Sequence, residues 1–147
     1  MYSKEPFPNT FFVVGAPLSL KFYRIRTPLQ TSFYTANLNQ DQHGGTVETF
    51  AHIFPTQQPD TVPMYRHYNP RTGDYYYTVR KSETKDGHQL EAISGYCYPG
   101  PKPGTVPFMR LSNSGGSHFY TTSNSEVQLN VGRGFKPEGP VCYLPEN

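Results

Sequence analysis

The stretch Tyr75-Tyr76-Tyr77-Thr78 occurs in two further versions in this chain of 147 residues, Ser32-Phe33-Tyr34-Thr35 and His118-Phe119-Tyr120-Thr121. The third residues of neighbouring versions are 43 positions apart in both cases. Each version follows a block that ends in arginine, and these blocks are Phe22-Tyr23-Arg24, Met64-Tyr65-Arg66 and Phe108-Met109-Arg110. A fixed period of this length is typical of repeat architectures. The sequence therefore predicts three copies of one structural unit.

A third block, which starts with glutamate, closes each unit, and its copies are Glu48–Phe54, Glu91–Cys97 and Glu138–Leu144. Apolar and polar residues alternate in the first two blocks, as in half-buried strands, and turn residues join them. We therefore expect a hairpin and a further strand in each unit, within one domain, at about 18–60, 61–104 and 105–147. Ser123 and Glu126 have capping-box spacing, which predicts a short helical turn at 123–130.

The expected fold is all-β with pseudo-threefold symmetry, because one unit cannot bury its own face and three units around an axis can. A β-trefoil fits best, and a small propeller-like or sandwich closure with short helical turns is the alternative. Twelve Tyr and ten Phe can supply the core, since each ring buries a large area. Residues 1–17 lie outside the repeats, and we expect their apolar run to pair with the last unit as a closing segment.

Charge and hydropathy exclude several classes of protein. The net charge of +2 comes from scattered Lys and Arg, so we expect no nucleic-acid partner. No stretch approaches the roughly 20 apolar residues of a membrane span. The first residues lack an apolar signal region, so we expect a cytoplasmic protein or one secreted without a recognisable signal peptide. Cys97 and Cys142 lie at similar places in two units, which favours free, partly buried thiols.

The second unit resembles an uncharacterised tyrosine-rich repeat domain of bacterial and fungal proteins, often appended to secreted hydrolases. The resemblance rests on residues 65–70, 73–78 and 91–96, and the third unit matches at 118–123 and 138–139. The first unit is degenerate, because Thr27-Pro28 and Thr31-Ser32 replace the Asn-Pro and Gly-Asp of the second. The resemblance covers about residues 20–147. It implies a three-unit architecture and attachment to surfaces or glycans, and it implies no activity.

Residues that recur in all three units favour structural roles. The repeated aromatic residues could form a sugar-stacking platform, but repetition in every unit favours a symmetric core. Phe33 and Tyr34 point to opposite faces of a strand, so we expect one ring set in the core and the other nearer the surface. The repeated arginines could bind a ligand carboxylate or sulfate. Structural stacking on rings, or pairing with Glu48, Glu91 or Glu138, is the favoured interpretation.

Polar and aromatic residues that the repeat does not require are better candidates for binding. They lie in the second and third hairpins, where loops on a rigid scaffold commonly carry function. Asp, Asn and His supply directional hydrogen bonds to sugar hydroxyls, and Tyr supplies a flat face. Ordinary turn chemistry is the alternative for Asp74 and Asn113. The candidate ligand-binding residues are His67, Asn69, Asp74, Tyr75, Asn113, Ser117 and His118, together with Arg66 and Arg110.

No pattern for catalysis or metal binding is present in the sequence. There is no nucleophile elbow and no phosphate-binding glycine loop. The five histidines contain no HExxH motif and no closely spaced pair, so we expect no zinc site, no other metal and no cofactor. Glu83 and Glu91 could serve a glycosidase, yet both belong to repeating blocks, which favours structural duty. We therefore expect a protein that is not an enzyme.

Three functions remain open on the sequence. The first is a carbohydrate-binding module or lectin, with glycans held by shallow sites on the hairpin loops of the second and third repeats. The second is a protein-binding module such as a protease inhibitor, with the irregular segment 38–45 as its inserting loop. The third is a structural protein that forms homo-oligomers through exposed rings.

Overall fold

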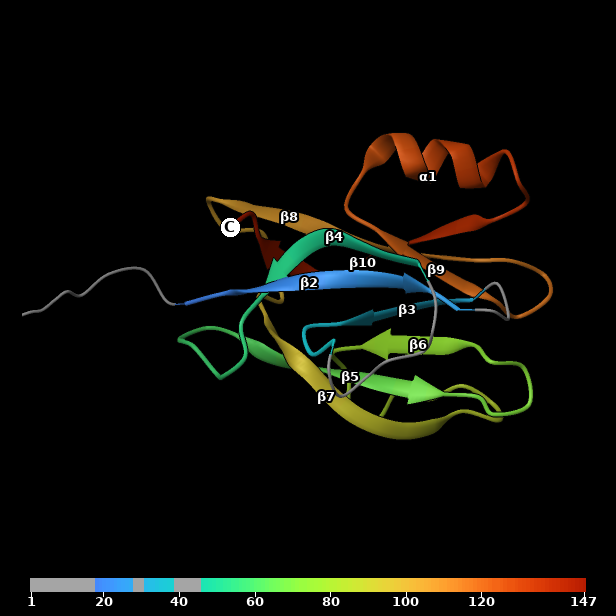
Figure 1. The fold of residues 1–147 in the computed structure, drawn as a ribbon, viewed down its shortest axis with the longest axis horizontal. Helices are drawn as coiled ribbons and strands as arrows, with labels where there is room; N and C mark the ends of the chain where they lie inside the picture. The colour runs from blue at the N-terminus through green and yellow to red at the C-terminus, as the bar shows by residue number, and fades with distance from the viewer. Residues whose placement is uncertain (1–17, 28–30, 39–45) are drawn as a thin grey trace, which may run out of the picture.

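The computed structural model describes residues 18–27, 31–38 and 46–147, and the regular secondary structure of these residues is β-strand apart from one short helix (Figure 1). They form three three-stranded antiparallel sheets, one from each predicted unit. The sheets consist of β2 (Leu20–Arg26), β3 (Ser32–Thr35) and β4 (Thr46–Ile53); β5 (Val62–Tyr68), β6 (Tyr75–Thr78) and β7 (Gln89–Cys97); and β8 (Thr105–Ser112), β9 (His118–Thr121) and β10 (Lys136–Pro145). The expected all-β fold, with a pseudo-threefold, β-trefoil-like arrangement, is confirmed. The predicted closing segment 1–17 lies outside the described residues.

Each sheet has the same strand order. The first strand of the unit is central, the four-residue hairpin strand pairs on one side, and the long third strand pairs on the other. The hairpin register is also the same, because the arginine of the first strand always lies opposite the repeated tyrosine of the second. These pairs are Arg24 with Tyr34, Arg66 with Tyr77 and Arg110 with Tyr120.

A cycle of three tyrosines forms the centre of the core. Tyr34, Tyr77 and Tyr120 are fully buried, and their rings meet edge to face with centroids 5.1–5.5 Å apart. The Tyr77 hydroxyl accepts from the Tyr34 N–H at 2.8 Å and donates to the Tyr34 carbonyl at 3.0 Å. The Tyr34 hydroxyl makes the same pair with Tyr120, at 3.0 and 2.7 Å. The Tyr120 hydroxyl accepts from the Tyr77 N–H at 2.8 Å. This tyrosine cycle joins all three units.

The repeated arginines lie between units and have structural partners. Each guanidinium stacks on a ring of another unit, and the pairs are Arg24 on Phe119 at 4.8 Å, Arg66 on Phe33 at 4.5 Å and Arg110 on Tyr76 at 4.4 Å. Each also pairs with the glutamate of its own third block, at distances of 3.3 Å for Glu48, 2.7 Å for Glu91 and 2.7 Å for Glu138. The guanidinium groups cover the second ring set, so it too is buried. The expectation that this set lies nearer the surface is therefore wrong.

A disulfide links Cys97 to Cys142, so the expectation of free thiols is wrong. The strand registers show why. Cys97 lies opposite Val62, whereas Cys142 lies opposite Phe108, which is two positions further along the equivalent strand. The two cysteines are therefore not symmetry-equivalent. Their strand ends converge, and the Tyr98–Tyr143 bridge next to them brings the two Cα atoms to 6.1 Å.

The predicted helical turn is α1 (Asn124–Val131), which begins after the N-cap Ser123. The Ser123 hydroxyl accepts the Glu126 N–H at 3.4 Å, as the capping-box spacing predicts. The Glu126 carboxylate also binds the Arg24 guanidinium at 3.0 Å through two nitrogens. The helix is thereby attached to the first unit.

Candidate ligand-binding site

The second and third hairpin turns are held by their own side chains. Asn69 Oδ1 accepts from two backbone N–H groups of its turn, at 2.9 and 3.3 Å. Asn113 Oδ1 does the same in the third unit, at 3.1 and 2.9 Å. Gly73 has a φ of 79°, a left-handed conformation that favours glycine. The turn chemistry considered for Asn113 is therefore present, and it makes both loops rigid supports.

Asp74 connects the two hairpins. Its Oδ1 accepts the backbone N–H of His118 at 2.7 Å. Its Oδ2 lies 2.6 Å from His118 Nδ1 and 2.8 Å from Nε2 of His88. The Asp74 side chain is 3% exposed and each imidazole is 5% exposed. A carboxylate this buried needs charge or hydrogen-bond partners, and the two imidazoles supply them.

Tyr76 packs among three histidines beside this carboxylate. Its ring centroid lies 5.0 Å from that of His118, and 6.2 Å from those of His88 and His67. Burial raises the pKa of Tyr76 to about 12, so its hydroxyl stays protonated at neutral pH. Burial lowers the pKa of His67, which favours its neutral form. His67 is therefore part of the wall behind the carboxylate.

A polar groove of about 480 Å³ lies between the second and third hairpins, and we call it the hairpin groove. Its volume is in the range of small-molecule sites. Its charged side chains, apart from the histidines, balance: two are cationic and two are acidic. The lining residues are Asn69, Arg71, Thr72, Thr84, Lys85, Asp86, His88, Ser112, Asn113, Gly115, Gly116, His118 and Glu138.

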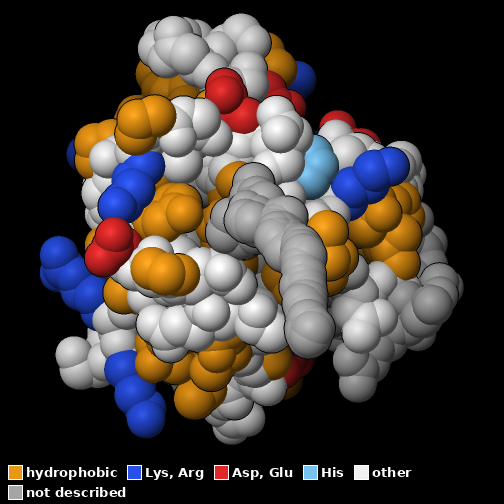
Figure 2. Space-filling view, turned by 90° about the vertical axis from the view of Figure 1, so that its left-hand side faces the viewer, with side chains coloured by type: hydrophobic (Ala, Val, Ile, Leu, Met, Phe, Trp, Pro, Cys, Tyr) orange, Lys and Arg blue, Asp and Glu red, His pale blue; other side chains and the backbone are white. Residues whose placement is uncertain are grey.

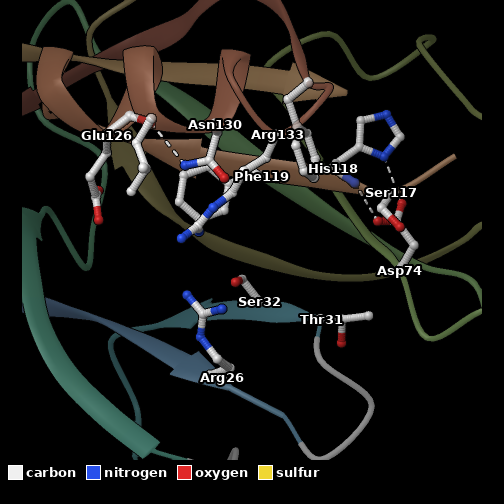
Figure 3. A pocket seen from close by; sticks show the side chains of 12 residues that line it. Arg26, Thr31, Ser32, Asp74, Ser117, His118, Phe119, Glu126, Asn130 and Arg133 are labelled. Atoms are coloured by element: carbon white, nitrogen blue, oxygen red, sulfur yellow. Dashed lines mark hydrogen bonds and ion pairs between the residues drawn. The ribbon is translucent and has the colours of Figure 1, made fainter. Parts of the chain in front are cut away.

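A second cavity, of about 270 Å³, lies between α1 and the first unit, and we call it the helix pocket. In Figure 3, Asn130 faces it from the helix and Arg133 from the turn that follows the helix, while Arg26 and Ser32 face it from the opposite side. Asp74 and His118 lie together at one end of the view. His118 lines both cavities, so the Asp74 cluster lies between the helix pocket and the hairpin groove.

The structure brings five of the nine sequence-predicted residues to these two cavities. Those in the hairpin groove are Asn69, Asn113 and His118, and those in the helix pocket are Asp74, Ser117 and again His118. Tyr75 is 4% exposed and packs against the rings of Phe33 and Tyr68, each at 4.7 Å, so it has no free face. His67 is buried behind the site, and the two predicted arginines have the structural partners described above.

Sequence reasoning did not identify His88, Arg71 or Lys85. His88 follows Asp74 by 14 positions and precedes β7, within a polar connection that matches no motif. Gly87 allows the chain to bring His88 to this position. The φ of Gly87 is 79°, and a Cβ on this residue would lie 2.9 Å from the side-chain nitrogen Nδ2 of Asn69. Only the residue type of His88, a histidine in a loop, could have marked it.

The charged side chains on one face of the molecule show no strong pattern (Figure 2). On the face seen in Figure 2, Lys and Arg side chains are scattered rather than gathered into one basic patch. Among the described residues, no helix has the length and apolar character needed to cross a membrane.

Comparison with known proteins identifies a family and no activity. A family model described as "Domain of unknown function (DUF5648)" matches residues 20–145. No curated protein matches the chain at a significant level, and no solved structure does so. The match covers all three units, from the start of β2 to the end of β10.

Proposed function

Because the chain belongs to the DUF5648 family, whose function is unknown, we propose from its geometry that it is a carbohydrate-binding module with the hairpin groove as its site. The observation that carries the proposal is the lining of this groove, which is mostly polar and comes from the second and third hairpins, the connection before β7, and β10. Asn, Ser, Thr, Arg and Lys side chains offer the directional donors and acceptors that hydroxyl-rich ligands need.

The balance of charge favours a neutral glycan over a sulfated or acidic one. Arg71 and Lys85 face the groove together with Asp86 and Glu138, so no excess positive charge awaits an anion. The repeated arginine Arg110 is bound to Glu138 at 2.7 Å. An anionic sugar would therefore meet as many carboxylates as cations among these four side chains, which costs binding energy.

We propose that the module is not catalytic. Burial disfavours the ionised form of Glu138, but hydrogen bonds from Ser112 and Arg110 outweigh it and hold the pKa below its usual value. The pKa of Glu83 is also lowered, because Thr78 and Arg110 outweigh the effect of burial. A glycosidase general acid needs a raised pKa. These carboxyl groups therefore stay ionised, as structural partners of arginine.

The disulfide supports a role in an oxidising compartment. Disulfides persist in secreted and periplasmic proteins and are rare in the cytosol. The Cys97–Cys142 bridge joins the second and third units, which are also the units that form the groove. The resemblance to domains appended to secreted hydrolases has the same implication. We propose that the module holds a hydrolase or a cell surface close to a glycan.

A glycan array followed by titration tests the proposal. We expect binding of neutral glycans, and binding at least about fivefold weaker for Asn113→Ala or Lys85→Ala, the loss that one hydrogen bond of about 1 kcal/mol implies. Lys102→Ala is the matched control, because this exposed lysine pairs with Asp60 away from the groove. An array without binding, or equal binding by all three variants, would refute the proposal.

The protease-inhibitor alternative stays a prediction. Most of its candidate loop, 38–45, lies outside the described residues. Titration of serine and cysteine proteases would test it directly, and sizing chromatography would test self-association.

A further inference from the structure

Three side chains that could ligate a metal converge from two units. Asp74 precedes β6, His88 precedes β7 and His118 begins β9. Asp74 Oδ2 lies 2.8 Å from His88 Nε2 and 2.6 Å from His118 Nδ1. The three ligand atoms all lie within 4.8 Å of one another. The cluster thus has the composition of two imidazoles and one carboxylate.

The contacts around Asp74 Oδ2 leave room for either protons or one cation. His88 Nε2 lies 2.8 Å and His118 Nδ1 lies 2.6 Å from this oxygen. In the metal-free protein each of these nitrogens can donate a ring proton to the carboxylate. With a metal bound to Nε2, the ring proton of His88 belongs on Nδ1, which lies 3.2 Å from the carbonyl oxygen of Asp86.

The surroundings resemble those of a built metal site. Metal-bound histidines usually donate their other N–H to a carbonyl or carboxylate, which orients the ring. The His88–Asp86 contact is such a bond. The Asp74 Oδ1 atom is held by the His118 N–H at 2.7 Å, which leaves Oδ2 directed at both imidazoles. Each of the three side chains is at least 95% buried.

We propose that Asp74 Oδ2, His88 Nε2 and His118 Nδ1 bind one divalent transition-metal ion of the zinc class. Two imidazole ligands favour Zn²⁺, Co²⁺, Ni²⁺ or Cu²⁺ over Ca²⁺ and Mg²⁺, which prefer oxygen ligands. In a tetrahedral zinc site with bonds of about 2.0 Å, ligand atoms are about 3.3 Å apart, so the contacts of Asp74 Oδ2 with His88 and His118, at 2.8 and 2.6 Å, open by about 0.5 and about 0.7 Å on binding. The metal replaces the two protons that His88 Nε2 and His118 Nδ1 direct at Asp74 Oδ2, and the proton of each neutral ring moves to the other ring nitrogen.

The fourth coordination position is available to a ligand or water. His118 lines both cavities and His88 lines the hairpin groove, so the ion would lie at the boundary of the two. The metal would also join the second and third hairpins. Sequence motifs could not reveal the site, since Asp74 and His118 are 44 positions apart. The proposal does not depend on glycan binding.

Titration of the metal-free full chain, without a polyhistidine tag, tests the proposal. We expect one equivalent of Co²⁺ to give the visible absorption of a tetrahedral site and Zn²⁺ to displace it. At a free metal concentration of a hundred times Kd, the Tm rises by about 5–10 °C. Ca²⁺ gives no shift. The absence of both the Co²⁺ bands and the Tm shift would overturn the proposal.

Variants locate the site. Asp74→Asn keeps the shape of the carboxylate, and His88→Gln keeps a polar side chain of similar length. We expect each variant to bind Co²⁺ at least tenfold more weakly, while His52→Gln, a change on β4 in the first unit, binds as the parent does. Unchanged binding by both site variants would refute the assignment. If the variants do not fold, X-ray absorption of the Zn²⁺-loaded parent decides, because fewer than two imidazole ligands would exclude this site.

Discussion

Removal of one hydroxyl from the tyrosine cycle should destabilise the whole domain. In Tyr34→Phe the ring remains, and the N–H and the carbonyl of Tyr120 both lose the hydroxyl as a hydrogen-bond partner. The carbonyl keeps the Arg24 Nη2 donor at 2.7 Å. The N–H is left buried without a partner, because Tyr120 is fully buried.

The size of the effect follows from this orphaned N–H. An unsatisfied buried donor costs about 1–3 kcal/mol, so the free energy of unfolding should fall by that amount. For a chain of this size, the corresponding fall in Tm is about 3–9 °C. Urea and thermal unfolding, followed by circular dichroism, measure both quantities. The losses in stability for Tyr77→Phe and Tyr120→Phe should lie in the same range, because each hydroxyl in the cycle accepts an equivalent backbone N–H.

Tyr65→Phe is the matched control, since this half-buried tyrosine lies in the second sheet and outside the tyrosine cycle. Its stability should change by less than about 0.5 kcal/mol. If Tyr34→Phe were no less stable than this control, the inference that the cycle holds the units together would be wrong.

Three further predictions concern the disulfide, the Arg24–Glu126 ion pair and the helix cap. Reduction, or replacement of Cys97 and Cys142 by alanine, should cost about 4 kcal/mol in denaturant unfolding, because the bridge spans 45 residues; an unchanged midpoint would contradict the bridge. The hydrogen bond from Arg24 holds the pKa of Glu126 below the usual value of a glutamate, although burial opposes it. This contribution to stability is present above pH 4.5 and is lost as the pH falls through the lowered pKa, so Glu126→Gln should flatten the fall of Tm in acid; an unaltered acid profile would refute this. Ser123→Ala should cost about 1 kcal/mol in thermal unfolding and Ser123→Gly only a few tenths, and equal losses would argue against a capping role.

The architecture was predictable because each copy of the repeat contains the same short sequence patterns. The alternation in the hairpins and the capping box at Ser123 depend on near neighbours in the chain, and the 43-residue period is visible when the three copies are compared. The burial of both ring sets was not predictable in this way. It depends on arginines that reach a neighbouring unit, and alternation along one strand does not show what another unit covers.

The candidate site was predictable only in part, for the same reason. Turn residues such as Asn69 and Asn113 indicate loops, and loops on a rigid scaffold are candidates for ligand binding. The approach of Asp74 to His88 and His118 depends on how two units pack, which no spacing encodes. The disulfide is not predictable from the repeat, because the two cysteines occupy similar places in the sequence blocks and Cys142 lies two positions away from the register of Cys97 only in the paired strands.

The hydrogen bonds of the tyrosine cycle form a closed ring through the three units. The hydroxyl of Tyr34 meets the backbone of Tyr120, in the last unit, as the hydroxyl of Tyr77 meets that of Tyr34. The contacts of the core therefore do not depend on which unit comes first in the chain. Circular permutants opened in either inter-unit linker, near residue 58 or residue 102, should keep the same core, and a chain of two units should leave one hydroxyl and one backbone N–H unmatched. A single unit would complete its ring only as a trimer.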